Sequence, residues 1–155
     1  MTGVTPAAPA PDPADWRVAA WRSFLRAHAT VIRDLERDLD NDAAMPLAWY
    51  DVLLTLAQAP ERKLRMAQLA DRVLLSRSGL TRLVDRLERE ELVRRERSSD
   101  DARGTYTVLT SAGLRRLKAA VPAHLASVQR HWLAHFDDAE LRTLAQLMAR
   151  IDADG

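Results

Sequence analysis

Apolar residues recur at steps of three and four through most of this 155-residue chain, the spacing of one face of an α-helix. The longest stripe predicts a helix from Asp15, as its N-cap, to about Leu39, a length of roughly 35 Å at about 1.5 Å per residue. A helix of that length is too long for one small domain to cover. Shorter stripes predict five more helices, which begin at or just after Pro46, Met66, Ser76, Thr110 and Asp137.

The helical spacing is interrupted between the fourth and fifth of these helices. Residues 92–97 and 105–109 alternate in polarity or carry β-branched side chains and predict two short strands. The polar residues 98–104 between them form the expected tip of a hairpin. The predicted order is therefore ααααββαα, a mainly α fold.

Composition excludes several classes of protein. The chain has no cysteine, which rules out disulfides, thiolate metal sites and thiol catalysis. It has five glycines, none of them clustered into a phosphate loop, and neither a nucleophile–base constellation nor paired carboxylates facing a cleft are recognisable. No apolar run approaches the roughly 18 residues of a membrane span. We therefore expect a cytoplasmic protein that is not an enzyme, needs no cofactor and has no membrane partner.

Positive charge is concentrated in the middle of the chain. Residues 61–104 hold 12 of the 23 Lys and Arg residues against 9 of the 22 Asp and Glu residues, although the whole chain has a net charge of only +1. All of these cations except Lys63 are arginine, whose planar fork matches phosphates and guanine edges. An arginine-rich helix face can also be simply solvated, so the pattern gains meaning only from the elements that carry it.

A short helix, a turn, an arginine-rich helix and a charged hairpin together indicate a winged helix-turn-helix. Its second helix fits the major groove of B-DNA, where side chains of its first turns reach base edges, and a hairpin tip can approach the negative minor groove. Arg103 is the candidate for the minor groove, with Asp101 able to pair with an arginine of the hairpin. The predicted DNA-binding residues are Ser76, Arg77, Ser78, Thr81, Arg82, Arg86, Arg94, Arg95, Asp101 and Arg103. Arg86, Arg94 and Arg95 are expected at phosphates. The alternative is a winged-helix protein-interaction module that reads no DNA.

The segment from Arg65 to Leu117 resembles the core of the MarR family of transcriptional regulators, within a similarity that extends over about residues 16–152. Its most specific part is Asp101-Ala102-Arg103-Gly104, followed by Val108-Leu109-Thr110 and Gly113. The resemblance implies that Asp101 and Arg103 hold the wing and place an arginine at the minor groove. It also implies a homodimer joined through the first and the last two helices. The chain departs from the family at Glu91, where members usually have glycine, so the turn into the first strand is expected to differ slightly.

Burial also predicts a homodimer, because the apolar stripes of the first and the last two helices have no partner in a domain of this size. A two-fold dimer presents two recognition helices roughly 34 Å apart and predicts a pseudo-palindromic operator. The domain boundaries follow from this division. We expect a disordered, proline-rich tail at 1–14, a dimerisation region at 15–45 and 110–155, and a DNA-binding region at 46–109.

The resemblance further implies a small, often aromatic, anionic effector that releases the DNA. The candidate ligand-binding residues are Trp16, Trp21, His28, Trp49, Asp51 and Arg82. Ordinary core packing is the alternative for the tryptophans, and an ion pair with an arginine is the alternative for Asp51. His131 and His135 have the spacing of a helical metal pair, but Phe136 and Asp137 indicate that the helix ends nearby, so no metal site is expected.

Overall fold

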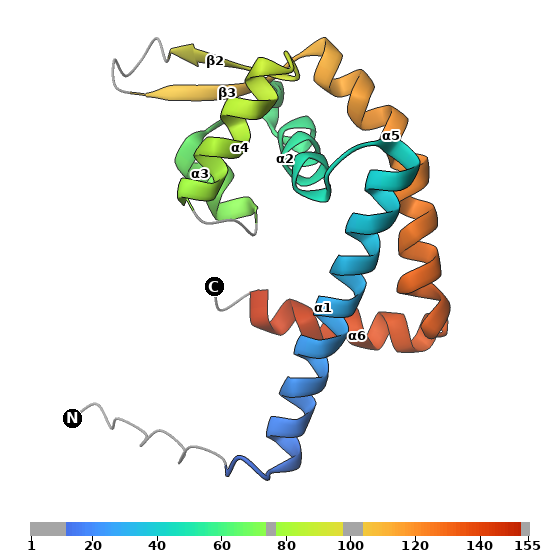
Figure 1. Ribbon diagram of the computed structural model, residues 1–155. Coiled ribbons are helices and arrows are strands. Elements are labelled where there is room, and N and C mark those ends of the chain that lie inside the picture. Colours follow the sequence, from blue (N-terminus) through green and yellow to red (C-terminus); the bar gives the residue numbers. More distant parts are fainter. Residues whose placement is uncertain (1–11, 74–76, 98–103, 153–155) are drawn as a thin grey trace, which may run out of the picture. The chain divides into compact units, whose positions relative to one another are not determined.

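The computed structural model describes residues 12–73, 77–97 and 104–152 (Figure 1). Within these residues the helices are α1 (Trp16–Ala43), α2 (Leu47–Gln58), α3 (Met66–Arg72), α4 (Arg77–Arg89), α5 (Ser111–His131) and α6 (Asp138–Asp152), with short 3₁₀ turns at η1 (Pro60–Arg62) and η2 (Leu133–His135). The strands are β1 (Lys63–Arg65), β2 (Val93–Arg97) and β3 (Thr105–Leu109). The predicted mainly α winged helix-turn-helix is confirmed. In the part of the chain described here, no helix is both long enough and apolar enough to span a membrane.

The strands form an antiparallel sheet in the order β1-β3-β2. Strand β1, which pairs Leu64 with Thr107 of β3, is absent from the predicted order ααααββαα. With three residues, β1 is too short for alternation to be recognised, and its pairing partner lies more than 40 positions away. The sequence therefore predicts the hairpin correctly and misses the third strand that anchors it.

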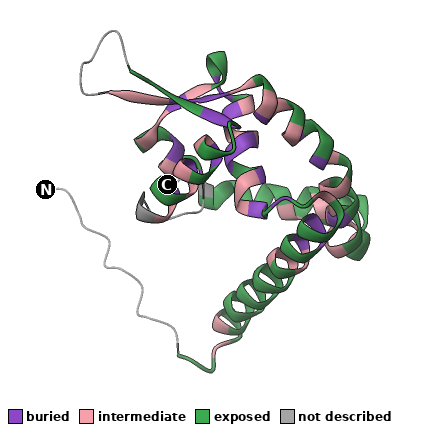
Figure 2. Ribbon diagram, turned by 45° about the horizontal axis from the view of Figure 1, so that its top comes forward, coloured by how far each residue is buried: buried purple, intermediate pink, exposed green. Residues whose placement is uncertain are grey.

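Two units make up the chain, residues 1–33 and residues 34–155. The described part of the first unit is the N-terminal portion of α1, whose large apolar side chains are exposed (Figure 2). Trp21 stacks on Phe24 with ring centroids 5.7 Å apart, and Phe24 lies against His28 at 6.2 Å. These aromatic residues therefore form a solvent-facing row rather than part of a core.

The core lies in the second unit, between α2, α3, α4, the sheet and α5. The completely buried side chains come from all of these helices and from the strands, and they include Leu53, Leu56, Leu69, Leu80, Val84, Leu87, Val93 and Thr107. Each buries an apolar surface worth roughly 1.5–3 kcal/mol, with the exception of Thr107, whose hydroxyl is 3.2 Å from the sulfur of Met66. The winged portion, which comprises α2, α3, α4 and the sheet, thus has its own core within one chain.

The beginning of α5 is fastened to the end of the α4–β2 turn. Thr110 caps α5 by accepting a hydrogen bond from the N–H of Gly113 at 2.9 Å, and its hydroxyl donates to the carbonyl of Glu91 at 2.8 Å. A Cβ on Gly113 would lie only 2.1 Å from the carbonyl oxygen of Leu92. Only glycine permits this approach, so Gly113 fixes how closely α5 packs on the sheet.

A buried carboxylate joins the end of α1 to the end of α5. Ser127 and Arg130 donate to Asp38 Oδ2 at 2.9 and 3.0 Å, and His131 Nε2 lies 2.8 Å from the same oxygen. Arg37 donates to the other oxygen at 3.2 Å. The hydrogen bond with His131 is the main cause that holds the pKa of Asp38 at about 2, against the desolvation that would raise it.

Candidate nucleic-acid interface

Helix α4 has one buried side and one exposed side. Leu80, Val84 and Leu87 are completely buried. Outside this buried stripe, Thr81, Arg82, Arg86 and Arg89 are exposed. The apolar stripe explains this orientation, because spacing of three and four places those residues on one face and the arginines on the opposite face. Helix α4 therefore presents to solvent four of the side chains that could reach a nucleic acid.

Several predicted DNA-binding residues lie outside the described residues. These are Ser76, expected as the cap of the recognition helix, and Asp101 and Arg103 at the hairpin tip. Arg77 and Ser78 occupy the first turn of α4, while their side chains are not described. Their roles remain the predictions made from the sequence.

The turn between α4 and β2 has the hydrogen bonds of a Schellman motif. The N–H of Leu92 donates to the carbonyl of Leu87 at 2.9 Å, and the N–H of Glu91 donates to that of Glu88 at 3.0 Å. Glu91 has a φ of 58°, the left-handed conformation that glycine adopts without strain. The turn thus keeps the left-handed geometry despite the glutamate, and the departure from the family pattern appears as strain at Glu91 rather than as a different turn.

The register of the sheet separates Arg94 from Arg95. Arg94 pairs with Val108 and Arg95 with Thr107, so their side chains leave opposite faces of β2. Arg94 is an exposed side chain that lies 3.1 Å from Glu96. Arg95 lies on the same face as the buried Thr107 and contacts Asp85 and Glu88 of α4, each at 2.5 Å. The hydrogen bond with Asp85 is the main cause that raises the pKa of Arg95.

The pairing of Arg95 with Asp85 and Glu88 is not predicted from the residue type of Arg95. Taken by itself, an arginine of the hairpin is expected at a phosphate. The available signal was the presence of two acidic residues, three apart, on the helix that precedes the strand. That spacing places both carboxylates on one side of α4, where a single arginine can bind both.

The predicted ligand-binding residues fall into both units of the chain. Trp16 and Trp21 are 77% and 57% exposed, and His28 is also exposed, so core packing within this chain does not explain them. Trp49 is half-buried on α2, and Asp51 on α2 and Arg82 on α4 are exposed. Neighbouring protein atoms nevertheless raise the pKa of Asp51 by desolvation. Among the residues that the structure describes, Asp51 makes no ion pair, and the alternative of a pair with an arginine stays untested for those outside them.

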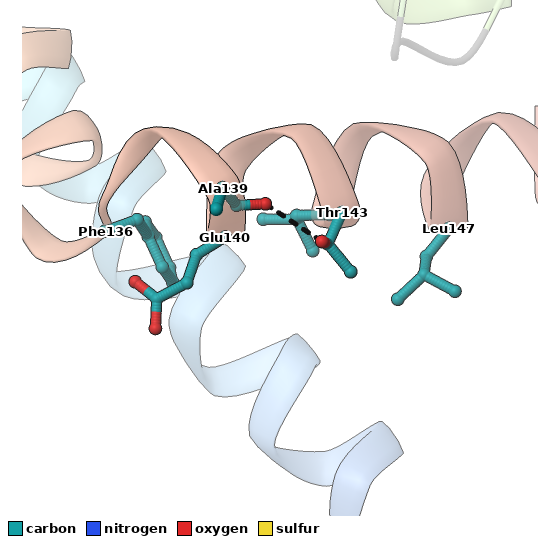
Figure 3. A pocket seen from close by; sticks show the side chains of 6 residues that line it. Phe136, Ala139, Glu140, Thr143 and Leu147 are labelled. Carbon is teal, nitrogen blue, oxygen red and sulfur yellow. Dashed lines mark hydrogen bonds between the residues drawn. The ribbon is translucent and has the colours of Figure 1, made fainter.

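Two hollows lie elsewhere in the second unit. A cavity of about 410 Å³ opens on α6, bordered by Phe136, Glu140, Thr143 and Leu147 among others (Figure 3). A smaller one of about 230 Å³ lies between α3 and α4, where Met66 and Leu80 border it. Neither is lined by a residue of the predicted ligand set.

His131 and His135 do not share a helix face. Helix α5 ends at His131, and His135 belongs to the following turn η2, as the nearby Phe136 and Asp137 indicated. His131 is engaged by Asp38 and lies 4.0 Å from Asp34. Among the residues that the structure describes, no group of three or more His, Asp or Glu side chains has an arrangement suited to a metal ion.

The chain is similar to known proteins in both sequence and fold. The sequence model of the MarR family matches residues 45–104. The structure of Sco3205 from Streptomyces coelicolor, a MarR family transcriptional regulator in complex with DNA, superposes with a TM-score of 0.80 at 36% identity, covering 88% of each chain. This chain belongs to the MarR family of transcriptional regulators.

Two further relatives agree with this assignment. AbsC, a MarR family regulator of Streptomyces coelicolor, superposes with a TM-score of 0.82 at 31% identity, covering 91% of this chain and 95% of AbsC. MhqR, an HTH-type transcriptional regulator of Bacillus subtilis (strain 168), is 28% identical over 86 residues, or 56% of this chain and 59% of MhqR. The match to that curated relative therefore spans less than two thirds of its length. The MarR resemblance inferred from the wing and the recognition helix is confirmed. The prediction of a regulator rather than an enzyme is confirmed by the same relatives.

Proposed function

We propose that this MarR-family chain is a transcriptional repressor that binds double-stranded DNA as a homodimer at a pseudo-palindromic operator. Residues 46–109 form the DNA-binding region, and residues 15–45 and 110–155 form the dimerisation region. A dimer bound at such a site represses by occupying DNA that RNA polymerase needs.

The observation that supports DNA binding is the exposed face of α4. Thr81, Arg82 and Arg86 project from a helix whose opposite side is completely buried, so the helix is held rigidly while its polar face is presented to solvent. Hydroxyl and guanidinium groups in this arrangement can donate to base edges and phosphates in a major groove. A protein-interaction module would more often present an exposed apolar patch at this place.

The apolar residues of α6 and α1 support a dimer. Leu147 and Ile151 are 42% and 67% exposed, and no described residue of α6 is buried. In α1 the exposed row of Trp21, Phe24 and Leu25 is likewise uncovered. A second copy of the chain would provide a partner for such apolar faces, and a two-fold dimer would present two α4 helices one turn of DNA apart.

A small aromatic anion is the proposed effector. Trp16, Trp21, His28, Trp49, Asp51 and Arg82 supply stacking surfaces, a cation and hydrogen-bonding groups for such a ligand. Titration of the free protein with aromatic carboxylates, followed by tryptophan fluorescence, should show saturable quenching and should release bound operator. Ligands that leave both the fluorescence and the operator complex unchanged would count against an aromatic anion.

The direct experiment selects operators from a random duplex library and measures binding by fluorescence anisotropy at several salt concentrations. Arg82→Ala should weaken binding about 10- to 100-fold and relax preference at one base pair. Arg86→Ala should weaken binding to all sequences and lower the salt slope by about 0.9. Arg142→Ala, which removes an exposed arginine of α6, is the matched control and should bind normally. Failure to enrich any sequence would contradict the proposed function.

A further inference from the structure

Arg95 is the one hairpin arginine, among the described residues, whose guanidinium joins β2 to α4. Its Nη1 lies 2.5 Å from Glu88 Oε2, and its Nη2 lies 2.5 Å from Asp85 Oδ1. Figure 1 shows that α4 lies beside the β2–β3 hairpin and leads into β2. The side chain of Arg95 is one third exposed, against more than half for Arg94. Arg95 is therefore committed to two partners inside the protein before any DNA arrives.

The backbone of β2 takes part in the same contact. Because the strand order is β1-β3-β2, one side of β2 is a free edge. The N–H of Arg95 donates to Glu88 Oε1 at 3.0 Å. One carboxylate thus binds both the main chain and the side chain of Arg95, which fixes the strand to the helix and covers an edge amide.

The two acidic residues lie on the helix that is proposed to enter the major groove. Asp85 lies one turn after Thr81 and directly before Arg86. Glu88 lies nearly one turn after Asp85 and faces β2. Carboxylates at these positions would repel the phosphates that Arg82 and Arg86 approach. Arg95 cancels one of the two charges and engages an oxygen of each.

We infer that Arg95 acts as a positioning residue rather than as a phosphate contact: it holds the hairpin on α4 and offsets one of the two negative charges of Asp85 and Glu88, so that Arg82 and Arg86 can reach DNA. This rests on the proposed DNA-binding function. It assigns Arg95 a role different from the phosphate contact expected from the sequence, whereas Arg86 and Arg94 keep that expectation.

A double-mutant cycle tests the inference. The proteins are the full-length chain, Arg95→Ala, the charge-neutral pair Asp85→Asn with Glu88→Gln, and the combination of all three substitutions. Operator affinity is measured by anisotropy at several salt concentrations, with circular dichroism showing that each protein is folded at the assay temperature. Arg95→Ala should weaken binding about 30-fold in the wild-type background and less than about 3-fold once both acids are neutral. Arg95→Lys, which keeps the charge, should recover part of the loss.

The salt dependence separates a positioning role from a phosphate contact. In the background with both acids neutral, Arg95→Ala should leave the slope of log affinity against log salt unchanged, while Arg86→Ala should lower it by about 0.9. An equal loss of affinity in both backgrounds, accompanied by a lower slope, would overturn the inference in favour of a phosphate contact. Unchanged affinity in Arg95→Ala would also overturn it. If the double exchange unfolds the protein, Glu88→Gln alone completes a smaller cycle with the same criterion.

The same binding measurements test the proposed DNA binding separately from the role of Arg95. Wild-type protein that selects an operator, together with an additive cycle, would refute the role of Arg95 and leave DNA binding intact. Wild-type protein that binds no duplex at low salt would refute the proposed function, and the inference with it.

Discussion

The winged portion and the terminal helices of this chain solve the problem of burial in different ways. Helices α2, α3 and α4 pack their leucines and valines in a common core with the sheet. Eight leucine and valine side chains of these helices and β2 are completely buried: Val52, Leu53, Leu56, Leu69, Leu80, Val84, Leu87 and Val93. Helix α6 has an equally regular apolar stripe and buries none of it. Similar stripes thus differ in burial, since one set is covered within the chain and the other stays exposed in the single chain.

The largest effect is expected at Gly113, where the start of α5 approaches the carbonyl of Leu92 closely. Gly113→Ala places a methyl group against the carbonyl of Leu92 and should destabilise the fold by about 3 kcal/mol. Urea unfolding at a fixed protein concentration measures this loss. Ala112→Gly, a half-buried neighbour in the same helix, is the control and should cost about 1 kcal/mol. Equal effects at the two positions would contradict the close approach of α5.

The second prediction concerns the uncovered stripe of α6. Leu147→Glu places a charge in the proposed dimer interface and should raise the dimer dissociation constant at least about 100-fold, since a buried unpaired charge costs several kcal/mol. The far-ultraviolet circular dichroism of the winged portion should persist. Sedimentation equilibrium measures the association, with Gln146→Glu, also exposed on α6, as the control. Dimers that resist Leu147→Glu would mean that this stripe has another partner.

The third prediction concerns Asp38, whose carboxylate joins the end of α1 to the end of α5. Asp38→Ala leaves Ser127 and His131 without their acceptor and should destabilise the protein by about 2–3 kcal/mol. The pKa of Asp38 is about 2 in the folded protein, below the ordinary value of 3.8, so its stabilisation is complete above about pH 5 and is lost as the pH falls toward 2. Unfolding free energies measured from pH 7 to pH 2 should therefore fall less steeply in Asp38→Ala. Parallel curves for the two proteins would contradict this role.

The sequence predicted those features that depend on neighbouring residues. The cap of Thr110 is confirmed by its hydrogen bond to Gly113, and the capping box of α6 is confirmed by the reciprocal bonds of Asp137 and Glu140. Contacts between distant residues were missed: β1 pairs across more than 40 positions, and Asp38 meets Ser127 across 89. Periodicity and capping reflect local geometry, whereas such pairs depend on how the elements pack.

The same distinction applies to the candidate interface. The helical period predicted that the arginines of α4 are exposed, because it predicts that Leu80 and Val84 face the core. The engagement of Arg95 did not follow, because the side of β2 from which it projects depends on the register with β3. Residue type alone makes every arginine of a basic segment a candidate for DNA, and only packing distinguishes those already paired.

The smallest effect is expected at the strained turn of the winged portion. Glu91→Gly removes the left-handed strain at φ 58° and should stabilise the protein by roughly 1 kcal/mol. Thermal unfolding at fixed protein concentration measures the gain, and Glu90→Gly, at the preceding exposed position, should instead be neutral or destabilising. A Glu91→Gly variant that is less stable than the wild type would show that the glutamate side chain contributes more than the turn costs.

Sedimentation equilibrium of the protein with its selected operator tests the central claim most directly. The account predicts two chains bound to one duplex with two half-sites, and a loss of affinity of at least about 10-fold when one half-site is scrambled. A single chain that binds a half-site as tightly as the whole operator would contradict the division between a self-contained winged portion and helices completed by a second copy.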